Sequence, residues 1–325
     1  MRAAAATTCP GRGTHGPSPA PRGTRASAQR AKQAVKNALY RTVGEASSAL
    51  GLAPNGRATL RVLMYHKVND IPDNPTTVPV GRFDEQLAQL RELGYRVVGL
   101  DAVLDHYVLG RPLPDRAVLI TFDDGYRDTL ENALPVLQQH GYPAVIFVPV
   151  AYMDDNMPLP HEALLVERGV RNPTLDWGLL RELDAAGVRV ESHGIAHRPL
   201  ADVPLDEAVR EIAVSKLRLE EELGRPVRAY AYVKGSEAHF HPVHQSILEQ
   251  SGYELGFTSI TRSNGPDTNR FRLGRYNVEP YPRRTFELVL SGACDLMSVK
   301  DTVAGTHARR LFNQALGTAT SREGR

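Results

Sequence analysis

Two acidic residues and two histidines carry the clearest chemistry in this sequence. Asp123 and Asp124 follow the apolar run AVLITF at 117–122. Adjacent carboxylates repel each other, so such a pair needs a cation or a proton nearby. Because consecutive residues point in different directions, one carboxylate can bind a metal while the other faces a substrate. The alternative for Asp124 is the ordinary N-cap of a helix, a position that Asp favours.

His193 and His197 follow a second β-rich run, VRVES at 188–192. Their spacing of four residues puts both imidazoles on one face if the segment is helical, and this spacing suits a metal. Taken alone, such a pair fits a second explanation equally well, in which one histidine is buried, the other is exposed and neither binds a metal. Together with Asp124, however, the pair makes a three-ligand set with open coordination positions, which is typical of a catalytic metal site.

The elements that must position these residues alternate along the chain from residue 57. The expected strands cover 61–67, 96–100, 117–122, 144–150, 188–192, 227–232 and 255–259. The expected helices cover 83–93, 101–109, 126–140, 176–186, 205–223 and 242–251. Single helices between strands imply parallel pairing with right-handed crossovers. We therefore predict an α/β fold, a distorted (β/α)7-type barrel, with its chemistry at the carboxyl ends of the strands.

Two stretches of the sequence resemble a known family. TFDDGY at 121–126 and SHGIAHRPL at 192–200 are similar to the first two motifs of the polysaccharide deacetylases, the NodB-homology group or carbohydrate esterase family 4. The resemblance covers roughly residues 60–280. It implies that Asp124, His193 and His197 hold a divalent metal ion, usually zinc, and that Asp123 is the general base.

The chemistry of these residue types agrees with that resemblance. A bound metal lowers the pKa of its water and polarises a carbonyl oxygen, and a carboxylate such as Asp123 can take the proton from the attacking water. The implied reaction is the hydrolysis of acetyl groups on N-acetylated, or alternatively O-acetylated, sugars of a polysaccharide or glycan. The expected partner is therefore an acetylated carbohydrate.

The later motifs of the family are less complete. Arg228 precedes the run AYAYVKG, but Val233 and Lys234 stand where the family has Pro and an aromatic residue. The run FRLGRYN at 271–277 resembles a later strand of the family and contains Arg275. Either Arg228 or Arg275 is thus expected to orient the Asp123 carboxylate, and a structural role for Arg228 is the alternative.

The general acid is not assigned by the sequence. The family's last motif, a Leu-rich strand that ends in His, is not visible, and His307 lies in a segment typical of a solvated helix. The candidates are histidines after the sixth strand, for each of which an exposed loop position is the alternative: His239, His241 and His244. His66, at the end of the first strand, lies on the same face of the barrel and either lines the site or belongs to the core.

Three other features bear on the substrate groove and on alternative functions. The insertion Met153–Thr174 forms either a wall of the groove or a mobile surface loop. Tyr276 and Tyr281 either stack on sugar rings or belong to the core. The departures at 233 and 234 also suit a degenerate, non-catalytic glycan-binding member, while two His and one carboxylate suit a non-haem iron oxygenase.

The amino-terminal residues differ in composition from the rest of the chain. Residues 1–56 hold eight Lys or Arg and one acid, which leaves 31 of 39 basic and 36 of 37 acidic residues, a net charge of −5, in the remainder. Such a body does not favour a nucleic-acid-binding surface. Residues 1–26 lack large apolar side chains, which predicts a disordered tail. They also lack the apolar stretch of a secretory signal, so the default expectation is a cytoplasmic protein, with association with the cell envelope as the alternative.

The remaining segments complete the predicted organisation. Residues 27–56 are expected to form one amphipathic helix and a linker, with Val35, Leu39, Val43, Ala46 and Leu50 on the apolar face. This face suits packing on the body or, alternatively, binding at a membrane surface. Residues 57–300 form the predicted deacetylase domain, and 301–325 form a carboxyl-terminal helix and tail. No run of 18 apolar residues exists, so no membrane span is expected. The sequence does not indicate an oligomeric state.

Overall fold

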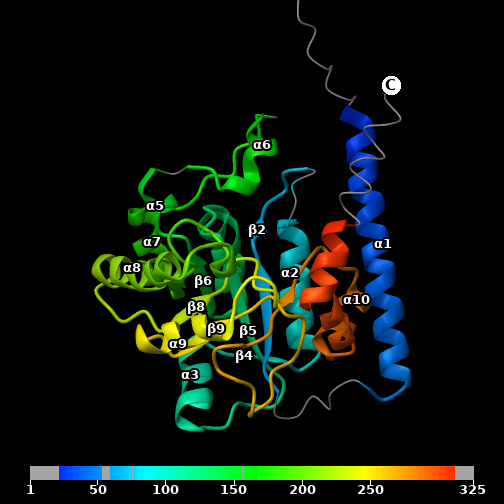
Figure 1. Ribbon diagram of the computed structural model, residues 1–325. Helices are drawn as coiled ribbons and strands as arrows, with labels where there is room; N and C mark the ends of the chain where they lie inside the picture. Colours follow the sequence, from blue (N-terminus) through cyan, green and yellow to red (C-terminus); the bar gives the residue numbers. More distant parts are fainter. Residues whose placement is uncertain are drawn as a thin grey trace, which may run out of the picture.

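A sheet of parallel strands curls into a half-barrel that is surrounded by helices (Figure 1). The computed structural model describes residues 22–52, 59–72, 74, 76–155, 157–167 and 169–311. The strand order along the sheet is β10-β1-β5-β6-β7-β8-β9, and every pair along this path is parallel. The predicted distorted barrel is therefore confirmed.

Six strands of the sheet lie where the β-rich runs predict them: β7 has the predicted bounds, β5 is one residue longer, and β1, β6, β8 and β9 are shorter, while β10 lies outside the seven predicted ranges. The strands along the barrel path are β1 (Arg61–Tyr65), β5 (Ala117–Asp123), β6 (Ala144–Val148), β7 (Val188–Ser192), β8 (Ala229–Ala231), β9 (Leu255–Phe257) and β10 (Tyr276–Asn277). The expected second strand is only β4 (Arg96–Val97), which pairs with the start of β5 and lies off the barrel path. A separate pair, β2 (Lys67–Val68) and β3 (Thr77–Val78), was not predicted.

Most of the predicted helices between the strands are present. They are α2 (Val80–Glu92), α3 (Leu100–Leu109), α4 (Leu134–His140), α7 (Trp177–Ala185), α8 (Leu205–Leu223) and α9 (Pro242–Gln250). A π-helical turn, η1 (Thr129–Ala133), precedes α4. The sequence analysis missed α10 (Arg283–Leu290), the short helix η4 (Asp295–Asp301) and the short helices of the insertion. Residues 303–311 are helical, as expected for the segment that contains His307.

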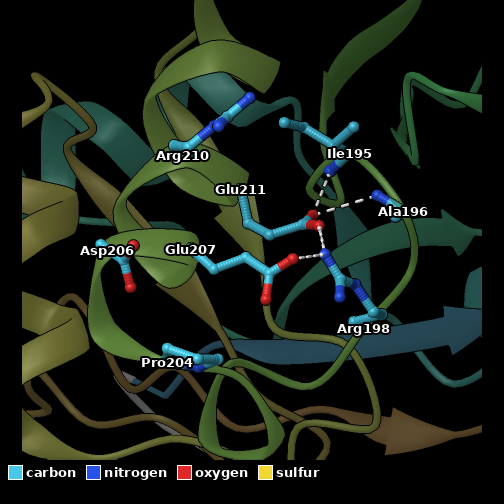
Figure 2. Close-up of a pocket in the computed structure, with 8 residues that line it drawn as sticks. All are labelled: Ile195, Ala196, Arg198, Pro204, Asp206, Glu207, Arg210 and Glu211. Carbon is cyan, nitrogen blue, oxygen red and sulfur yellow. Dashed lines mark hydrogen bonds and ion pairs between the residues drawn. The ribbon is translucent and has the colours of Figure 1, made fainter.

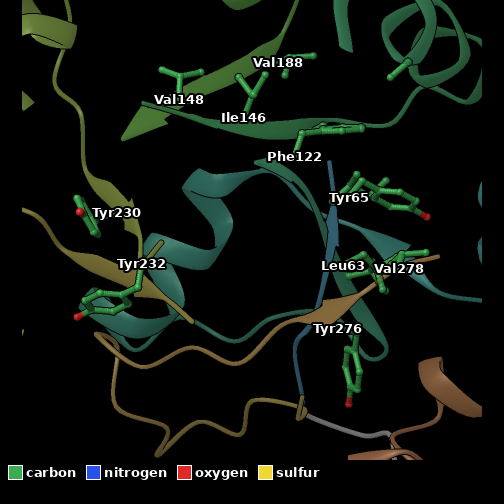
Figure 3. Close-up of a cluster of buried hydrophobic side chains, with 14 of the residues drawn as sticks. Leu63, Tyr65, Phe122, Ile146, Val148, Val188, Tyr230, Tyr232, Tyr276 and Val278 are labelled. Carbon is green, nitrogen blue, oxygen red and sulfur yellow. The ribbon is translucent and has the colours of Figure 1, made fainter. Parts of the chain in front are cut away.

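Alternation along the strands creates two apolar layers. One layer lies between the sheet and the helices, and Figure 3 shows its strand residues, including Leu63, Phe122 and Ile146. The other layer fills the inside of the barrel and is formed by the alternate strand positions, including Val62, Leu119 and Phe147. Phe122 therefore faces the helices, and the next residue of β5, Asp123, faces the interior.

The segment at 271–277 closes the barrel between β9 and β1. Leu273 forms a parallel bridge with Phe257 of β9, and four residues later Asn277 of β10 is in register with Met64 of β1. Arg275 lies between these two contacts, so its side chain enters the interior from the closing segment. Tyr276 and Tyr281 are both 1% exposed, which makes them core residues rather than sugar-stacking ones.

The amino-terminal helix differs from its prediction in both position and orientation. Helix α1 (Arg22–Ala49) begins five residues before the predicted start, within the predicted tail. The described side chains on the expected apolar face are largely exposed, with Val35 at 70% and Leu39 at 49%, whereas Tyr40 is buried. Gly44 explains the difference, because a Cβ there would lie 2.9 Å from Leu288 of α10. A small residue thus determines which face packs.

The rest of the predicted terminal segments lies outside the described residues. Residues 1–21 of the predicted tail, 53–58 of the predicted linker and 312–325 of the carboxyl-terminal tail are not described. Across the described ranges, no helix combines the length and apolarity that a bilayer crossing would require.

Candidate active site

The two adjacent carboxylates at the end of β5 face different partners. Asp123 faces the barrel interior, where Arg275 Nη1 and Nη2 donate to its two carboxylate oxygens at 2.6 and 2.7 Å. Asp124 has a left-handed backbone with φ 77°, which turns its side chain away from that arginine. The adjacent charges are therefore separated by the backbone conformation at the end of the strand.

Arg275 is itself held from several sides inside the barrel. Its Nε donates to the carbonyl oxygen of Thr258 at 2.9 Å, and its guanidinium carbon lies 5.5 Å from the centre of the Phe147 ring. Burial is the largest influence on the pKa of Asp123 and raises it, but the charge and hydrogen bonds of Arg275, together with the charges of His193 and His66, hold that pKa below its ordinary value. Asp123 is thus an ionised carboxylate in a fixed orientation at neutral pH.

Asp124 lies among imidazoles. Its Oδ1 is 2.9 Å from His197 Nε2 and 3.6 Å from His193 Nε2. His193 Nδ1 donates to the carbonyl oxygen of Ala231 at 2.8 Å, which directs Nε2 toward the carboxylate. Burial would raise the pKa of Asp124, but His197 and His193 lower it well below its ordinary value. The three ligands expected from the sequence are therefore brought together.

The two histidines are brought together by a loop and not by a helix. Residues 193–197 have no helical conformation; Gly194 has φ 82° and His197 has φ 53°. A Cβ at Gly194 would lie 3.0 Å from Glu211 and 3.1 Å from the Tyr230 hydroxyl. The segment is therefore not helical, and the left-handed backbone at Gly194 and His197 brings the two imidazoles together instead.

Glu211 of α8 holds this loop from behind (Figure 2). Its Oε2 accepts hydrogen bonds from the backbone nitrogens of Ile195 at 2.6 Å and Ala196 at 3.0 Å, and Arg198 Nη2 donates to its Oε1 at 3.3 Å. These residues line a pocket beside the loop together with Pro204, Asp206, Glu207 and Arg210. Glu211 could not be singled out from the sequence, because it is one of many acids on an amphipathic helix.

A third imidazole comes from the insertion. The segment contains α5 (Tyr152–Asp155), η2 (Pro160–Glu162) and α6 (Ala163–Glu167). His161 of η2 has its Nε2 3.5 Å from Asp124 Oδ2, and its ring centre is 5.2 Å from that of His197. Asp124, His161 and His197 offer ligand atoms within 4.8 Å of one another, so these residue types are able to hold a metal ion. The insertion therefore lies at the site.

His66 directly follows β1, next to the carboxylate pair. Tyr65 is in register with Phe122, so the residues that follow them, His66 and Asp123, are neighbours across the two strands. Burial lowers the pKa of His66, while the charges of Asp124 and Asp123 raise it in part. Its Nδ1 is buried and has no hydrogen-bond partner within the described part of the chain. Of the two positions expected for His66, the site or the core, the structure places it at the site.

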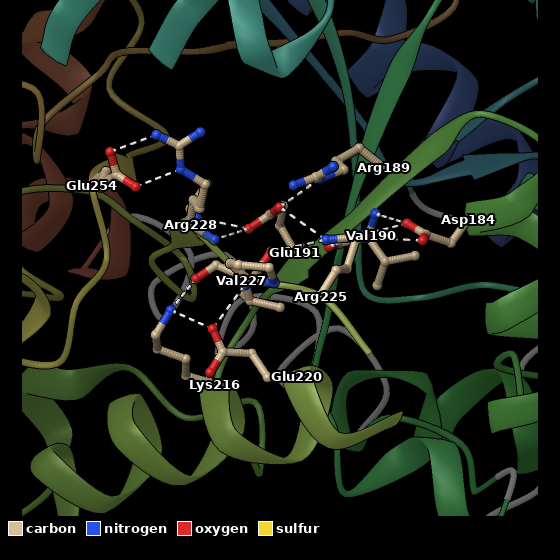
Figure 4. A network of polar contacts seen from close by, with 12 residues as sticks. Asp184, Arg189, Val190, Glu191, Lys216, Glu220, Arg225, Val227, Arg228 and Glu254 are labelled. Carbon is tan, nitrogen blue, oxygen red and sulfur yellow. Dashed lines mark hydrogen bonds and ion pairs between the residues drawn. The ribbon is translucent and has the colours of Figure 1, made fainter. Parts of the chain in front are cut away.

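The other arginine candidate lies elsewhere. Arg228 pairs with Glu254, with Nη2 to Oε2 at 2.7 Å, in a network of polar contacts around Glu191 (Figure 4). Its backbone nitrogen also donates to Glu191 Oε2 at 2.7 Å. The prediction that left Arg228 and Arg275 open is thus resolved in favour of Arg275, because Arg228 lies at the start of β8 and not in the closing segment.

The expected general-acid candidates have partners outside the carboxylate pair. His239 Nδ1 bonds the Ser236 hydroxyl at 2.8 Å, and burial lowers its pKa to about 4. His244 Nδ1 accepts from the His241 backbone nitrogen at 3.0 Å, and burial also lowers its pKa to about 4. His241 is thus the N-cap residue of α9, and His244 is its partner in a capping box. These contacts give both imidazoles structural roles.

The family model described as polysaccharide deacetylase matches residues 110–256 of this chain. The matched range contains both motifs that carry the resemblance in the sequence. YxkH of Bacillus subtilis (strain 168), whose name places it among the polysaccharide deacetylases, is 25% identical over 249 residues, 77% of this chain and 82% of that protein.

Further similarity is to an N-deacetylase and to solved structures. The poly-β-1,6-N-acetyl-D-glucosamine N-deacetylase of Escherichia coli (strain K12) is 36% identical over 85 residues, which are 26% of this chain and only 13% of that protein. The structure of IcaB from Ammonifex degensii has a TM-score of 0.60 with 26% identity and covers 73% of this chain and 97% of that chain. The Streptococcus pyogenes deacetylase PplD, with a TM-score of 0.61, 21% identity and coverage of 72% and 99%, shares the fold.

Proposed function

We propose that this protein is a metal-dependent deacetylase that hydrolyses N-acetyl groups on the sugars of a glycan, with Asp123 as the general base. One observation carries the proposal. The two adjacent carboxylates of β5 have separate environments, with Asp123 on a guanidinium and Asp124 among imidazoles. Such a division assigns proton transfer to the first and metal binding to the second.

The donor set fits a divalent metal ion. Asp124, His193 and His197 offer one carboxylate oxygen and two imidazole nitrogens, and the hydrogen bond from His193 to Ala231 is the kind of outer contact that orients a metal-bound histidine. Zn²⁺ is the ion that this mixture of nitrogen and oxygen ligands suits best. When bound, the ion would polarise the acetyl carbonyl and activate a water molecule.

The protein's own residues account for the proton transfers. Asp123 is ionised at neutral pH and accepts a proton from the attacking water, while Arg275 fixes its orientation with two hydrogen bonds. His66 lies beside Asp123, and its Nδ1 has no hydrogen-bond partner among the described residues, so in its protonated form it can donate a proton to the leaving amine. The carbon–nitrogen bond of the acetamide breaks, and the products are acetate and a free amino sugar.

The substrate class is proposed from the relatives. One of them is named for poly-β-1,6-N-acetyl-D-glucosamine, so oligomers of β-1,6-linked N-acetylglucosamine are the first substrates to test. The described residues include the whole proposed base and ligand set, and no observation favours a non-catalytic binding protein or an iron oxygenase over hydrolysis.

Two variants at the end of β5 test the proposal. We expect Asp123→Asn to lower the rate of acetate release by about 10² to 10⁴-fold while the protein still binds Zn²⁺, because only the base is removed. We expect Asp124→Asn to lose both activity and bound metal. The measurement is acetate released from β-1,6-linked N-acetylglucosamine oligomers, with the metal content of each protein determined in parallel.

The control is Asp176→Asn, at the N-cap of α7, where the side chain accepts from the Leu179 backbone nitrogen. Asn caps a helix as well as Asp does, so this protein should match the wild type in both measurements. Full activity of Asp123→Asn would refute the assigned base, and full activity of chelated wild-type protein would refute the dependence on metal.

A further inference from the structure

The Asp124 carboxylate faces one more imidazole than the proposed metal set uses. His193 and His197 approach Oδ1, while His161 approaches the other oxygen, Oδ2, with its Nε2 at 3.5 Å. Zn²⁺ binds nitrogen and oxygen ligands at about 2.0 to 2.2 Å in a tetrahedron, so two ligand atoms on one ion lie about 3.3 to 3.5 Å apart. The separation between His161 and Asp124 therefore suits two ligands of the same ion.

The backbone at His161 is held in place by a buried network. The next residue, Glu162, is 2% exposed, and its Oε1 forms an ion pair with Lys67 Nζ at 2.5 Å. Asn172 donates to Glu162 Oε2 at 2.6 Å, and the Tyr126 hydroxyl donates to Oε1 at 3.2 Å. Burial of a charged pair is costly unless it is fully hydrogen-bonded, as it is here. The insertion is thus anchored next to the residue that faces Asp124.

The segment that follows β5 also contacts His161. Tyr126, two residues after Asp124, has its hydroxyl 2.8 Å from His161 Nε2. The backbone continues this contact, because Tyr126 and Thr174 form an antiparallel bridge and Leu175 donates its N–H to the Gly125 carbonyl oxygen at 2.8 Å. His161 and the carboxyl-terminal end of the insertion are therefore both tied to the segment that carries Asp124.

The three histidines differ in how deeply they lie. The side chain of His161 is 42% exposed, compared with 13% for His197 and 3% for His193. A catalytic metal site needs an open coordination position for water or substrate. If one histidine leaves the metal during the reaction, the most exposed one requires the least rearrangement of the core.

We propose that His161 is an additional metal ligand in the substrate-free protein and that the substrate displaces it. This inference rests on the proposed metal-dependent function. It assigns the insertion a specific task, which is to close the metal site when no glycan is bound and to leave an open position when the glycan arrives.

Metal binding to the complete chain tests this inference. We expect His161→Ala and His161→Gln to weaken Zn²⁺ binding by at least about tenfold, the loss that follows when a supporting group of a metal site is removed. The measurement is competition with a chromophoric chelator. In the Co²⁺-loaded protein, both variants should also shift the visible absorption band of the metal relative to wild type. The control His307→Ala, on the exposed face of the carboxyl-terminal helix, should leave both quantities unchanged.

A second arm tests displacement. Addition of a saturating N-acetylglucosamine oligomer should move the Co²⁺ absorption of wild type toward that of His161→Ala, and should change the variant's spectrum less. Wild-type Zn²⁺ affinity and an unchanged Co²⁺ spectrum in both variants would overturn the ligand assignment. An oligomer that binds without any spectral change would overturn displacement. Absence of metal binding in wild type would instead remove the proposed function, and this inference with it.

Discussion

Two regions of this molecule bury clusters of charged side chains, and they differ in the partners of their carboxylates. Around Glu191 of β7, the backbone nitrogens of Arg228 and Ala229 each donate to Oε2 at 2.7 Å, and Arg189 Nε donates to Oε1 at 3.2 Å (Figure 4). At the end of β5, Asp124 contacts three imidazoles from two other segments of the chain.

This difference separates a structural cluster from a site. Both oxygens of Glu191 already accept hydrogen bonds from fixed donors of the described chain. The site holds imidazole nitrogens that converge on one carboxylate, and the buried Nδ1 of His66 has no partner in the described ranges. Burial and charge alone therefore do not identify a functional site. The type of polar atom, and whether it is left available to bind a ligand, distinguish the two regions.

The largest effect expected from this comparison is at Arg275. The change Arg275→Met leaves Asp123 as an unpaired buried carboxylate, which should lower the free energy of unfolding by about 3 to 5 kcal/mol. The rate of acetate release should fall as well, because the base loses its orientation. Urea unfolding at pH 7 and the acetate assay on the folded protein measure the two effects.

The loss of stability at Arg275 should depend on pH. Because Arg275 holds the pKa of Asp123 below its ordinary value, the stabilisation is complete above the unfolded pKa of about 3.9. It is lost as pH falls through the lower folded pKa. In metal-free protein, the difference between wild type and variant should therefore shrink below pH of about 4. A difference that stays constant down to pH 2 would contradict the ion-pair explanation.

An intermediate effect is expected at Glu191. The change Glu191→Gln keeps the shape but removes the charge and one acceptor, so the free energy of unfolding should fall by about 1 to 3 kcal/mol. Zn²⁺ affinity and the rate of acetate release per folded molecule should not change, because the partners of Glu191 among the described residues include no proposed metal ligand. A loss of metal affinity in this variant would contradict the division between the two regions.

The smallest effect is expected at Arg228. Its side chain is 34% exposed and pairs with the partly exposed Glu254, so Arg228→Ala should cost about 0.2 to 1 kcal/mol of stability. The matched change Glu254→Ala should cost a similar amount. Acetate release should remain at the wild-type rate in both. A rate as low as that of Arg275→Met would show that Arg228 orients the base after all.

Much of the fold follows from local patterns in the sequence. Helix α8 has the predicted bounds, Leu205–Leu223, because its apolar positions recur at helical spacing and Gly224 ends it in the left-handed conformation. The carboxyl ends of β5 and β7 are also predictable, because each strand is an apolar or β-rich run that stops at polar residues. For that reason Asp124, His193 and His197 were correctly expected to lie together.

The remaining site residues depend on long-range contacts that no local pattern records. The choice between Arg228 and Arg275 depends on how the 271–277 segment closes the barrel. The place of His66 depends on the register of β1 with β5. His161 lies in an insertion without periodicity, where contacts with distant residues determine its position, such as the buried pair of Lys67 and Glu162, which are 95 residues apart.

The most direct test of the central claim is a metal titration of the wild-type protein. Metal-free protein, prepared with a chelator and dialysed, is supplied with Zn²⁺ in steps while acetate release from N-acetylglucosamine oligomers is measured. We expect almost no release at the start and a rise that ends at one equivalent of Zn²⁺ per chain. Undiminished release from the metal-free protein would contradict this expectation.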